Sequence, residues 1–334
     1  MSMLLVFQLF LSCAICVFII SLLKPLAKKI DLLDHPNSNR KVHQGAIPLI
    51  GGIAIFCTFC IVSLLANSPL GFYRSLFLGG GIITFLGVLD DYKSVSPRFR
   101  LIMQFIVAVI VMSQSNISIS NLGNLLNFGL IPLNQATSVL LTLFCIVALI
   151  NAVNMIDGLD GLVGLISLSS IVWFIVLSYL YALQSYMHCL FIILGALLGF
   201  LLFNLRHPWR KQASVFLGDG GSTLLGFLLA WFSLSIVYSP MPHHAPIRPV
   251  VLLWILFLPI SDLIFSSIRR MINGGSPFQA DKGHLHHVLL ELGFSVRKTV
   301  FLMFFIAILA GGIGVAFNFF NCPDYISFLL FVVF

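Results

Sequence analysis

The architecture of this chain follows from the run Tyr186-Met-His-Cys-Leu-Phe-Ile-Ile-Leu-Gly-Ala-Leu-Leu-Gly-Phe-Leu-Leu-Phe-Asn204. The run contains no Asp, Glu, Lys or Arg, and as a helix it would be about 28 Å long, which matches the roughly 30 Å hydrocarbon core of a bilayer. Similar runs recur along the 334 residues, which are 59% hydrophobic, only 9% charged and include 32 Phe. In lipid, helices satisfy their own backbone hydrogen bonds. We therefore predict an all-α, polytopic membrane bundle.

Ten apolar runs and a shorter eleventh are expected to form a single membrane domain that covers residues 1–334. The ten lie near 3–23, 48–66, 71–89, 99–114, 137–153, 160–180, 186–204, 217–237, 248–268 and 300–320. The eleventh begins near 325 and gives about 15 Å of helix, so either the chain is trimmed or its tail ends inside the bilayer. Lys24, Lys28 and Lys29 follow the first run without a cleavage site. We expect an uncleaved anchor with its N-terminus outside the cell.

Charged side chains gather on one predicted face. The loops expected in the cytoplasm, with their helix edges, hold 16 of the 18 Lys and Arg residues, the exceptions being Arg74 and Arg248. They also hold 10 of the 11 Asp and Glu residues, all except Asp324. The positive-inside rule explains the basic excess but says little about acids. The acidic set therefore predicts an active site on the cytoplasmic face. The net charge of +7 suits anionic lipids or substrates and does not call for nucleic acid.

Two carboxylate pairs stand at predicted inner helix ends. Asp90 and Asp91 are adjacent and would repel each other without Mg²⁺ or a basic partner, although a solvated turn is the alternative. The run Asn151-Ala-Val-Asn154-Met-Ile-Asp157-Gly-Leu-Asp160 places Asn or Asp at every third position. Each such step drifts about 60° around a helix, so we expect the helix to break at Gly158 and Gly161 and to re-aim Asp160. The oxygen ligands suit Mg²⁺ or Mn²⁺, and capping chemistry is the alternative.

Three further motifs on this face suit an anion. The run Phe216-Leu-Gly-Asp-Gly-Gly-Ser-Thr223 predicts exposed N–H groups at a helix N-terminus. Asp219 in this run could hold a metal against a phosphate. The alternative is an ordinary capped turn. The run His284-Leu-His-His287 suits phosphate or sugar hydroxyls, with zinc or a plain surface loop as alternatives. The run Arg40-Lys-Val-His43 precedes a Gly-rich helix start and suits an anion, unless it is only a basic flank.

Two other features have simpler explanations. Cys13-x-x-Cys16 and Cys57-x-x-Cys60 have redox or zinc spacing, but both lie in apolar runs where Cys behaves as a small hydrophobic residue. Asp262 is expected to pair with a helix-end arginine such as Arg269. Taken together, the motifs on the inner face indicate Mg²⁺-dependent phosphoryl chemistry on an anionic lipid.

From about residue 24 to 300, the order of motifs resembles that of the polyprenyl-phosphate N-acetylhexosamine-1-phosphate transferases. The resemblance is carried by Asp90-Asp-Tyr92, Asn151-Ala-Val-Asn-Met-Ile-Asp-Gly-Leu-Asp-Gly-Leu162, Phe216-Leu-Gly-Asp-Gly-Gly-Ser222, Ser276-Pro-Phe278 and Asp281-Lys-Gly-His-Leu-His-His287. The His-x-His-His form and the motif from Arg40 to Pro48 favour the bacterial undecaprenyl-phosphate GlcNAc-1-phosphate branch over the MurNAc-pentapeptide branch. Lys282-Gly283 replaces an Arg-Gln pair common in the family, which leaves the sugar selectivity open.

The resemblance implies a reaction in which UDP-GlcNAc and undecaprenyl phosphate give GlcNAc-pyrophosphoryl-undecaprenol and UMP. This would be the first membrane step of a cell-envelope polysaccharide, at the cytoplasmic face of the bacterial inner membrane. It further implies Mg²⁺, or Mn²⁺ in its place, and a homodimer is compatible with it. Another UDP-N-acetylhexosamine donor is the nearest alternative. A transporter is the alternative from a different class, but it would place charges near the bilayer midplane.

The resemblance also implies a role for each candidate residue. Asp219 and Asn154 would hold the metal against the diphosphate of the donor. The nucleotide would lie against Asn151, Asp157 and Phe216. Asp90 would act as base or orienter for the lipid phosphate, and the same catalytic set would include Asp91, Asp157 and Asp160. Lys41, His43 and Arg100 would attract that phosphate, and the diphosphate or sugar would meet His284, His286 and His287.

Overall fold

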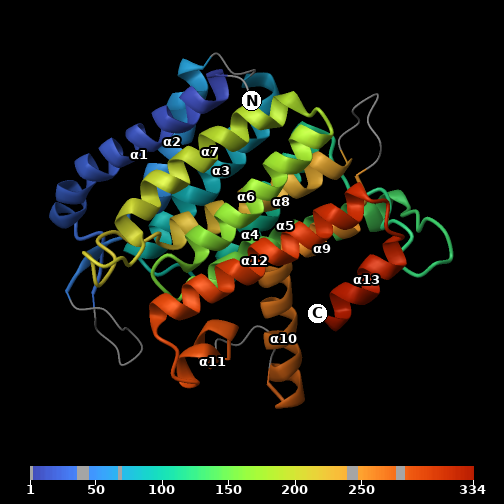
Figure 1. The fold of residues 1–334 in the computed structure, drawn as a ribbon. Coiled ribbons are helices and arrows are strands. Elements are labelled where there is room, and N and C mark those ends of the chain that lie inside the picture. The colour runs from blue at the N-terminus through green and yellow to red at the C-terminus, as the bar shows by residue number, and fades with distance from the viewer. Residues whose placement is uncertain (1–2, 36–44, 67–69, 239–246, 276–282) are drawn as a thin grey trace.

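The structure is a computed structural model that describes residues 3–35, 45–66, 70–238, 247–275 and 283–334. Eight helices in these ranges are long and apolar enough to cross a membrane: α1 (Met3–Lys29), α3 (Leu70–Tyr92), α4 (Pro97–Ser115), α5 (Gln135–Ile156), α6 (Leu162–Leu180), α7 (Gln184–Asn204), α8 (Asp219–Tyr238) and α12 (Val296–Phe319). The shorter helices are α2 (Gly51–Leu65), α9 (Val250–Ile255), α10 (Phe257–Ile272), α11 (Leu285–Glu291) and α13 (Asp324–Val333). A short antiparallel pair joins β1 (Leu33–Asp34) to β2 (Ile47–Pro48). The all-α polytopic bundle is confirmed (Figure 1).

The predicted ninth span, 248–268, is wrong as a single helix. It divides at Leu256 into α9 and α10. Pro259 lies in the first turn of α10, where it has no N–H to donate to the carbonyl of Ile255, and its ring crowds that carbonyl. The helix therefore cannot continue in a straight line, and Figure 1 shows α10 projecting away from the bundle. With this span divided and α2 and α13 short, eight described helices rather than ten or eleven have the length of a membrane span.

Helix α8 is the central helix of the bundle. It is almost wholly buried and packs against α2, α3, α5 and α6. Its aromatic side chains are part of the core, where the Trp231 and Phe232 rings meet edge to face with centroids 5.1 Å apart. Because Asp219 is the first residue of α8, the central position of the helix places this carboxylate in the middle of one end of the bundle.

Helix α1 lies against α7 through two glycines spaced four residues apart. A Cβ added to Gly195 would lie 2.2 Å from the carbonyl oxygen of Leu9, and one added to Gly199 would lie 2.7 Å from that of Cys13. Small residues with this Gly-x-x-x-Gly spacing let two helices approach closely in a membrane, where van der Waals packing drives association. The close contact fixes the first helix against the bundle.

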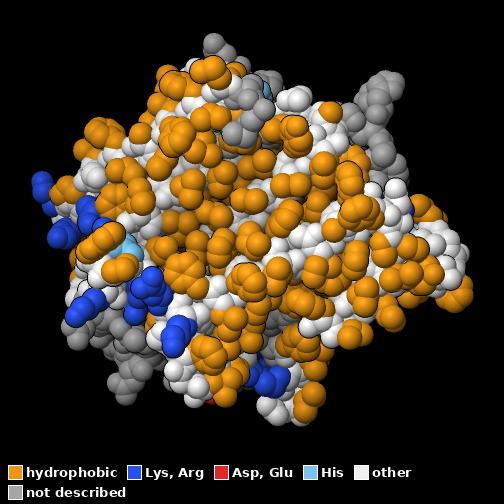
Figure 2. Space-filling model, viewed as in Figure 1, with side chains coloured by type: hydrophobic (Ala, Val, Ile, Leu, Met, Phe, Trp, Pro, Cys, Tyr) orange, Lys and Arg blue, Asp and Glu red, His pale blue; other side chains and the backbone are white. Residues whose placement is uncertain are grey.

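Charged groups separate to the two ends of the molecule. In Figure 2, Lys and Arg side chains gather at the lower left, below a broad apolar surface. Arg248 and Asp324, two of the three exceptions expected on the opposite face, pair with each other at 3.5 Å (Arg248 Nε to Asp324 Oδ1). Asp324 also accepts a hydrogen bond of 2.8 Å from the backbone N–H of Asn124. This pair attaches α13 to its neighbours, which gives Arg248 and Asp324, but not Arg74, a structural explanation.

Candidate active site

The first turn of α8 is capped by a side chain from α3. The carboxylate of Asp91 accepts hydrogen bonds from the backbone N–H groups of Asp219 at 2.9 Å and Gly220 at 3.3 Å. A carboxylate at this position satisfies N–H groups that a helix N-terminus leaves without partners. Of the two alternatives predicted for this motif, the capped turn is therefore the one observed at Asp219 and Gly220, whose N–H groups are not free for a substrate anion.

The glycines of this motif serve close packing. A Cβ on Gly87 of α3 would lie 2.4 Å from the Cα of Gly220, and one on Gly52 of α2 would lie 2.3 Å from the backbone nitrogen of Gly221. The glycines thus let the start of α8 sit between α2 and α3. This packing brings Asp91 within reach of the N–H groups. It leaves the Asp219 side chain facing a pocket between α3, α4, α5 and α8, called the hollow below.

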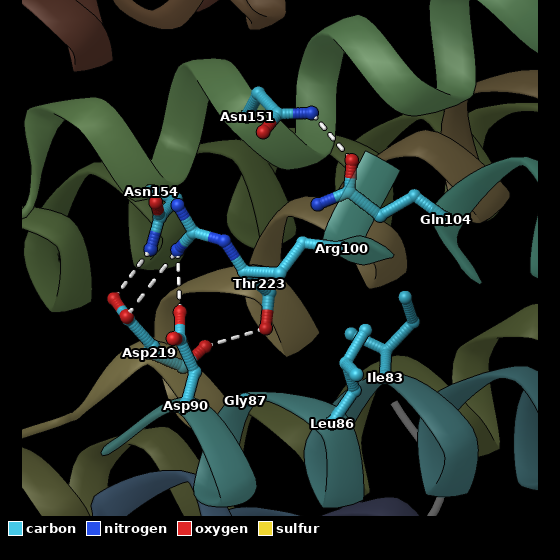
Figure 3. A pocket seen from close by; sticks show the side chains of 10 residues that line it. All are labelled: Ile83, Leu86, Gly87, Asp90, Arg100, Gln104, Asn151, Asn154, Asp219 and Thr223. Atoms are coloured by element: carbon cyan, nitrogen blue, oxygen red, sulfur yellow. Dashed lines mark hydrogen bonds and ion pairs between the residues drawn. The ribbon is translucent and has the colours of Figure 1, made fainter. Parts of the chain in front are cut away.

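Arg100 of α4 lies between two carboxylates in that hollow. Its Nη1 is 2.5 Å from Asp90 Oδ2 and 3.6 Å from Asp219 Oδ2 (Figure 3). Asp90 also accepts a 2.7 Å hydrogen bond from the N–H of Val95, and its side chain is only 8% exposed, whereas that of Asp219 is 38% exposed. Asp90 therefore holds Arg100 in place, and Asp219 is the more accessible of the two carboxylates.

Asn154 of α5 orients Asp219. Its Nδ2 donates to Asp219 Oδ1 at 2.9 Å and to the hydroxyl of Ser222 at 2.8 Å. The hydroxyl of Thr223 in turn donates to the carbonyl of Asp219. These contacts fix the first turn of α8 against the end of α5, so the structure brings the two predicted metal ligands together.

One residue of the hollow was missed at the sequence level. Gln104, almost fully buried on α4, accepts a 2.6 Å hydrogen bond from Nδ2 of Asn151, and both residues line the hollow with Arg100 (Figure 3). The available signal was a polar residue within an apolar run, four positions after Arg100 and therefore on the same helix face. The amides of Gln104 and Asn151 extend the polar lining from the carboxylates towards the interior of the bundle.

Asp157 directly follows α5, and its side chain remains accessible to water. Protein atoms nevertheless crowd it, and this desolvation is the main reason why its pKa is raised above the ordinary value. Three carboxylates add to the rise, in decreasing order those of Asp219, Asp91 and Asp160. This excess of negative charge would favour a cation near Asp157, and the implied contact of Asp157 with the nucleotide stays a prediction.

Asp160 has contacts of a different kind. Its Oδ2 accepts hydrogen bonds from Nε of Arg206 at 2.7 Å and from the N–H of Ala213 at 2.9 Å, and its side chain is 7% exposed. Gly161 begins α6 with a φ of +83°, so the chain does turn here and re-aims Asp160 away from Asp157 as expected. Asp160 fixes the α7–α8 loop, and a direct catalytic role for it stays a prediction.

The predicted histidines form a second cluster beside this turn. The ring centroids of His286 and His287 are 4.2 Å apart, and those of His284 and His286 are 5.9 Å apart. His286 packs on the turn after α5, where a Cβ on Gly158 would lie 2.3 Å from its Nε2. The histidine segment (residues 284–287) and the turn after α5 (residues 157–161, the Asp157 turn) are more than 120 residues apart in sequence. They are nevertheless in direct contact.

His286 is almost completely buried, with 1% of its surface exposed. Burial is the main reason why its pKa is lowered to about 4, and the neighbouring His287 contributes. The ring is therefore neutral at physiological pH. It can give or accept a hydrogen bond, but it does not supply a positive charge to a phosphate.

The other predicted substrate contacts have different outcomes. Phe216 lies beside Leu49 in a parallel bridge, and its N–H donates to the carbonyl of Pro48 at 2.9 Å. The end of the α7–α8 loop is thereby joined to the chain that enters α2. Lys41 and His43 lie outside the described residues, so their predicted contacts with the lipid phosphate stay predictions.

The donor set of the hollow fits Mg²⁺ when a substrate supplies further ligands. Carboxylate oxygens of Asp219 and Asp90 are the hard donors this ion prefers, whereas thiolates do not line the hollow. No group of three or more His, Cys, Asp or Glu able to hold a metal occurs within the part of the chain that the structure describes. Mg²⁺ commonly takes one or two carboxylates and completes its shell with phosphate oxygens and water. The site thus suits a metal that arrives with a diphosphate.

The fold and the site define an integral membrane protein with a carboxylate, amide and arginine constellation at one end of a helical bundle. The chain belongs to glycosyl transferase family 4, which matches residues 73–237. Similar curated proteins are the undecaprenyl-phosphate alpha-N-acetylglucosaminyl 1-phosphate transferases of Yersinia pestis (34% identical over 87% of this chain and 78% of the relative), Pasteurella multocida (35%, 93% and 86%) and Escherichia coli strain K12 (33%, 93% and 83%). The family resemblance seen in the sequence is confirmed.

Proposed function

We propose that this protein transfers GlcNAc-1-phosphate from UDP-GlcNAc to undecaprenyl phosphate and releases UMP. The observation that carries the proposal is the set of Asp90, Arg100, Asn154 and Asp219 around one hollow at the end of the central helix. The printed names of the relatives, which are similar over most of this chain, support both the transferred group and the lipid acceptor.

The reaction is a single displacement at phosphorus. An oxygen of the lipid phosphate forms a bond to the sugar-linked phosphorus of the donor, and the bond from that phosphorus to the bridging oxygen breaks, so that UMP leaves with the electron pair. A phosphate monoester is already anionic near pH 7, so little proton removal is needed. Asp90, buried and bound to Arg100, acts by orienting the guanidinium toward the phosphates rather than as a strong base.

Asp219 would hold Mg²⁺ together with the donor diphosphate, and Asn154 would keep Asp219 in place. When bound, the metal would neutralise charge that develops on the phosphate oxygens. Arg100 supplies a positive charge beside Asp219, with its Nη1 3.6 Å from Asp219 Oδ2. Preorganised charges of this kind are what phosphoryl transfer requires of a protein. Mn²⁺ could take the same position.

We assign the active site to the cytoplasmic face of the bacterial inner membrane. The support is the gathering of basic groups at the end of the bundle that carries the hollow, together with the bacterial source of the relatives. In that position the product would begin a cell-envelope polysaccharide. Assembly as a homodimer remains compatible with this arrangement.

The test is a reconstituted transfer reaction. Purified protein is incubated with undecaprenyl phosphate and a panel of UDP-sugars, with Mg²⁺, Mn²⁺ or EDTA, and UMP is measured. We expect UMP from UDP-GlcNAc only when both the lipid phosphate and a divalent cation are present. Asp219→Asn and Asp90→Asn should each lower turnover by about 10²–10³-fold, whereas Asp31→Asn, an exposed control, should not.

Near-normal turnover in both site variants would refute the assignment of the site. A preference for another UDP-N-acetylhexosamine would keep the chemistry and change the donor. UMP release that persists in EDTA would remove the metal from the proposal.

A further inference from the structure

Helix α10 carries a buried polar stripe that the proposed reaction does not use. Asp262, Ser266 and Arg270 recur every four residues and are all buried, so they lie on one helix face. Exposed apolar side chains lie elsewhere on the helix, including Phe265 and Ile272. A helix that projects from the bundle thus turns its acid and its arginine inward, toward the histidine segment.

Asp262 is the centre of a network that holds this segment. Its Oδ2 is 2.7 Å from Nδ1 of His284, and its Oδ1 accepts a 2.8 Å hydrogen bond from the N–H of Leu285. Ser266 Oγ lies 3.3 Å from the same Nδ1. The side chains of Asp262 and His284 are only 4% and 7% exposed. The expected pairing of Asp262 with a helix-end arginine is therefore replaced by a buried carboxylate–histidine pair.

The contacts of His284 select one form of its ring. Nη2 of Arg270 lies 3.3 Å from Nε2 of His284, and a guanidinium has only donors. Nε2 must then accept, so the ring hydrogen lies on Nδ1 and is donated to Asp262. Both ring nitrogens of His284 are therefore engaged by the protein, which leaves this histidine little capacity for direct substrate contact.

His286 is in the opposite situation. Among the described residues, neither of its ring nitrogens has a hydrogen-bond partner, although the ring is 1% exposed. Its plane is within 8° of the plane of His284, and it packs on the Asp157 turn at Gly158. A buried polar group without a partner is costly. Both ring nitrogens therefore keep unused hydrogen-bonding capacity where the ring packs on the Asp157 turn.

We propose that Asp262 is a positioning residue of the transferase, which fixes the Nδ1–H form of His284 and thereby holds His286 at the Asp157 turn. This inference rests on the proposed function. A carboxylate that orients a histidine in this way typically changes activity by about 10–100-fold when it is replaced. At Gly283, a Cβ would overlap the guanidinium of Arg269, so the histidine segment lies directly against this side chain of α10.

Asp262→Asn is the decisive substitution. The amide can donate to Nδ1, which would move the ring hydrogen to Nε2 and set it against the donors of Arg270. In ¹⁵N NMR spectra of histidine-labelled protein, with His284 assigned through His284→Gln, wild type should show the Nδ1–H form and the variant should not. We expect kcat/KM for UDP-GlcNAc to fall by about 10–100-fold, with an unchanged KM for undecaprenyl phosphate.

Asp324→Asn is the matched control. Like Asp262, Asp324 pairs with a basic side chain, here Arg248, and accepts from one backbone N–H, but at the opposite end of the molecule. It should lose comparable thermal stability while keeping wild-type kinetics. An Asp262→Asn protein with wild-type kcat/KM, or equal activity losses in both variants, would overturn the proposal.

The ring-form measurement separates this inference from the proposed function. If wild type releases no UMP from any donor, the proposed function fails, and the NMR result still tests the network. An Nε2–H form of His284 in wild type would overturn the inference even in a fully active transferase.

Discussion

At the scale of single residues, Asp90 and Asp91 are adjacent and yet do different work. Consecutive side chains on an α-helix point about 100° apart. Asp90 therefore meets Arg100 of α4, while Asp91 meets the N–H groups at the start of α8. Each of the two acids therefore has a separate partner.

Removing the Asp91 cap should loosen the start of α8. Asp91→Ala leaves the N–H groups of Asp219 and Gly220 without their partner, and the loss of an N-cap costs about 1–2 kcal/mol. The melting temperature of the purified protein should fall accordingly, while Asp31→Ala, which removes an exposed pair with His35, should change it little. An unchanged melting temperature in Asp91→Ala would contradict the capping role.

Acid should destabilise the protein through His286. Its pKa is lowered from an ordinary 6.5 to about 4 by burial, so the unfolded chain takes up the proton first as the pH falls. The associated stability is fully present above pH 6.5 and is lost as the pH falls through 4. At about 1.4 kcal/mol per pH unit, this loss approaches about 3 kcal/mol. The melting temperature of His286→Gln should show a flatter pH dependence in this window, and parallel curves would refute the explanation.

At the scale of secondary-structure elements, packing decides positions that apolar composition leaves open. The run 248–268 has the composition of a span, but Pro259 divides it and lets α10 leave the bundle. The opposite case is α7, whose two spaced glycines let it approach α1 closely. Both the proline and the pair of glycines are visible in the sequence. Their effect on the fold depends on the helices that pack beside them.

The contact between α1 and α7 should not tolerate a methyl group. Gly195→Ala would place a Cβ 2.2 Å from the carbonyl oxygen of Leu9, so the helices must separate. Overpacking typically costs about 1–3 kcal/mol. Gly71→Ala is the control, because a Cβ there meets no atom within 4 Å. A thermal unfolding series should show a loss for Gly195→Ala and none for Gly71→Ala. Equal behaviour would argue against this contact.

At the scale of the whole molecule, charge distribution and chemistry coincide. The hollow with Asp219, the Asp157 turn and the histidine segment belong to one end, while the Arg248–Asp324 pair lies at the other. An acidic site that binds anionic substrates needs cations nearby, and the basic groups of the same end provide them. The proposed orientation, with these groups inside the cell, would give the site access to a donor in the cytoplasm.

This orientation predicts a labelling pattern. In a background without native cysteines, Ser94→Cys lies in the short α3–α4 connection and Asn127→Cys in the α4–α5 connection at the other end. A membrane-impermeant maleimide should label Asn127→Cys in intact cells, and Ser94→Cys only after the membrane is opened. The reverse pattern would place the active site outside the cytoplasm.

Most of the fold and the list of site residues could be predicted, because both depend on local sequence. Apolar runs set most of the helices to within a few residues. Paired acids in an apolar chain marked Asp90, and a glycine-rich helix start marked Asp219. Partners could not be predicted in the same way. Gln104 was overlooked because a single polar residue in a span has no visible partner in sequence, and Asp262 was expected to pair with an arginine of its own helix.

The amino-acid sequence by itself determined that the chain is a helical membrane protein with its acids at one end, because hydrophobic length and charge position act locally. Only the tertiary structure decided that Asp91 caps α8, that Asp160 holds a loop, and that Asp262 fixes His284. Each of these contacts joins residues more than 20 positions apart. A carboxylate takes its role from the donor that folding places within about 3 Å of it, and that distance is set by the packing of helices rather than by spacing along the chain.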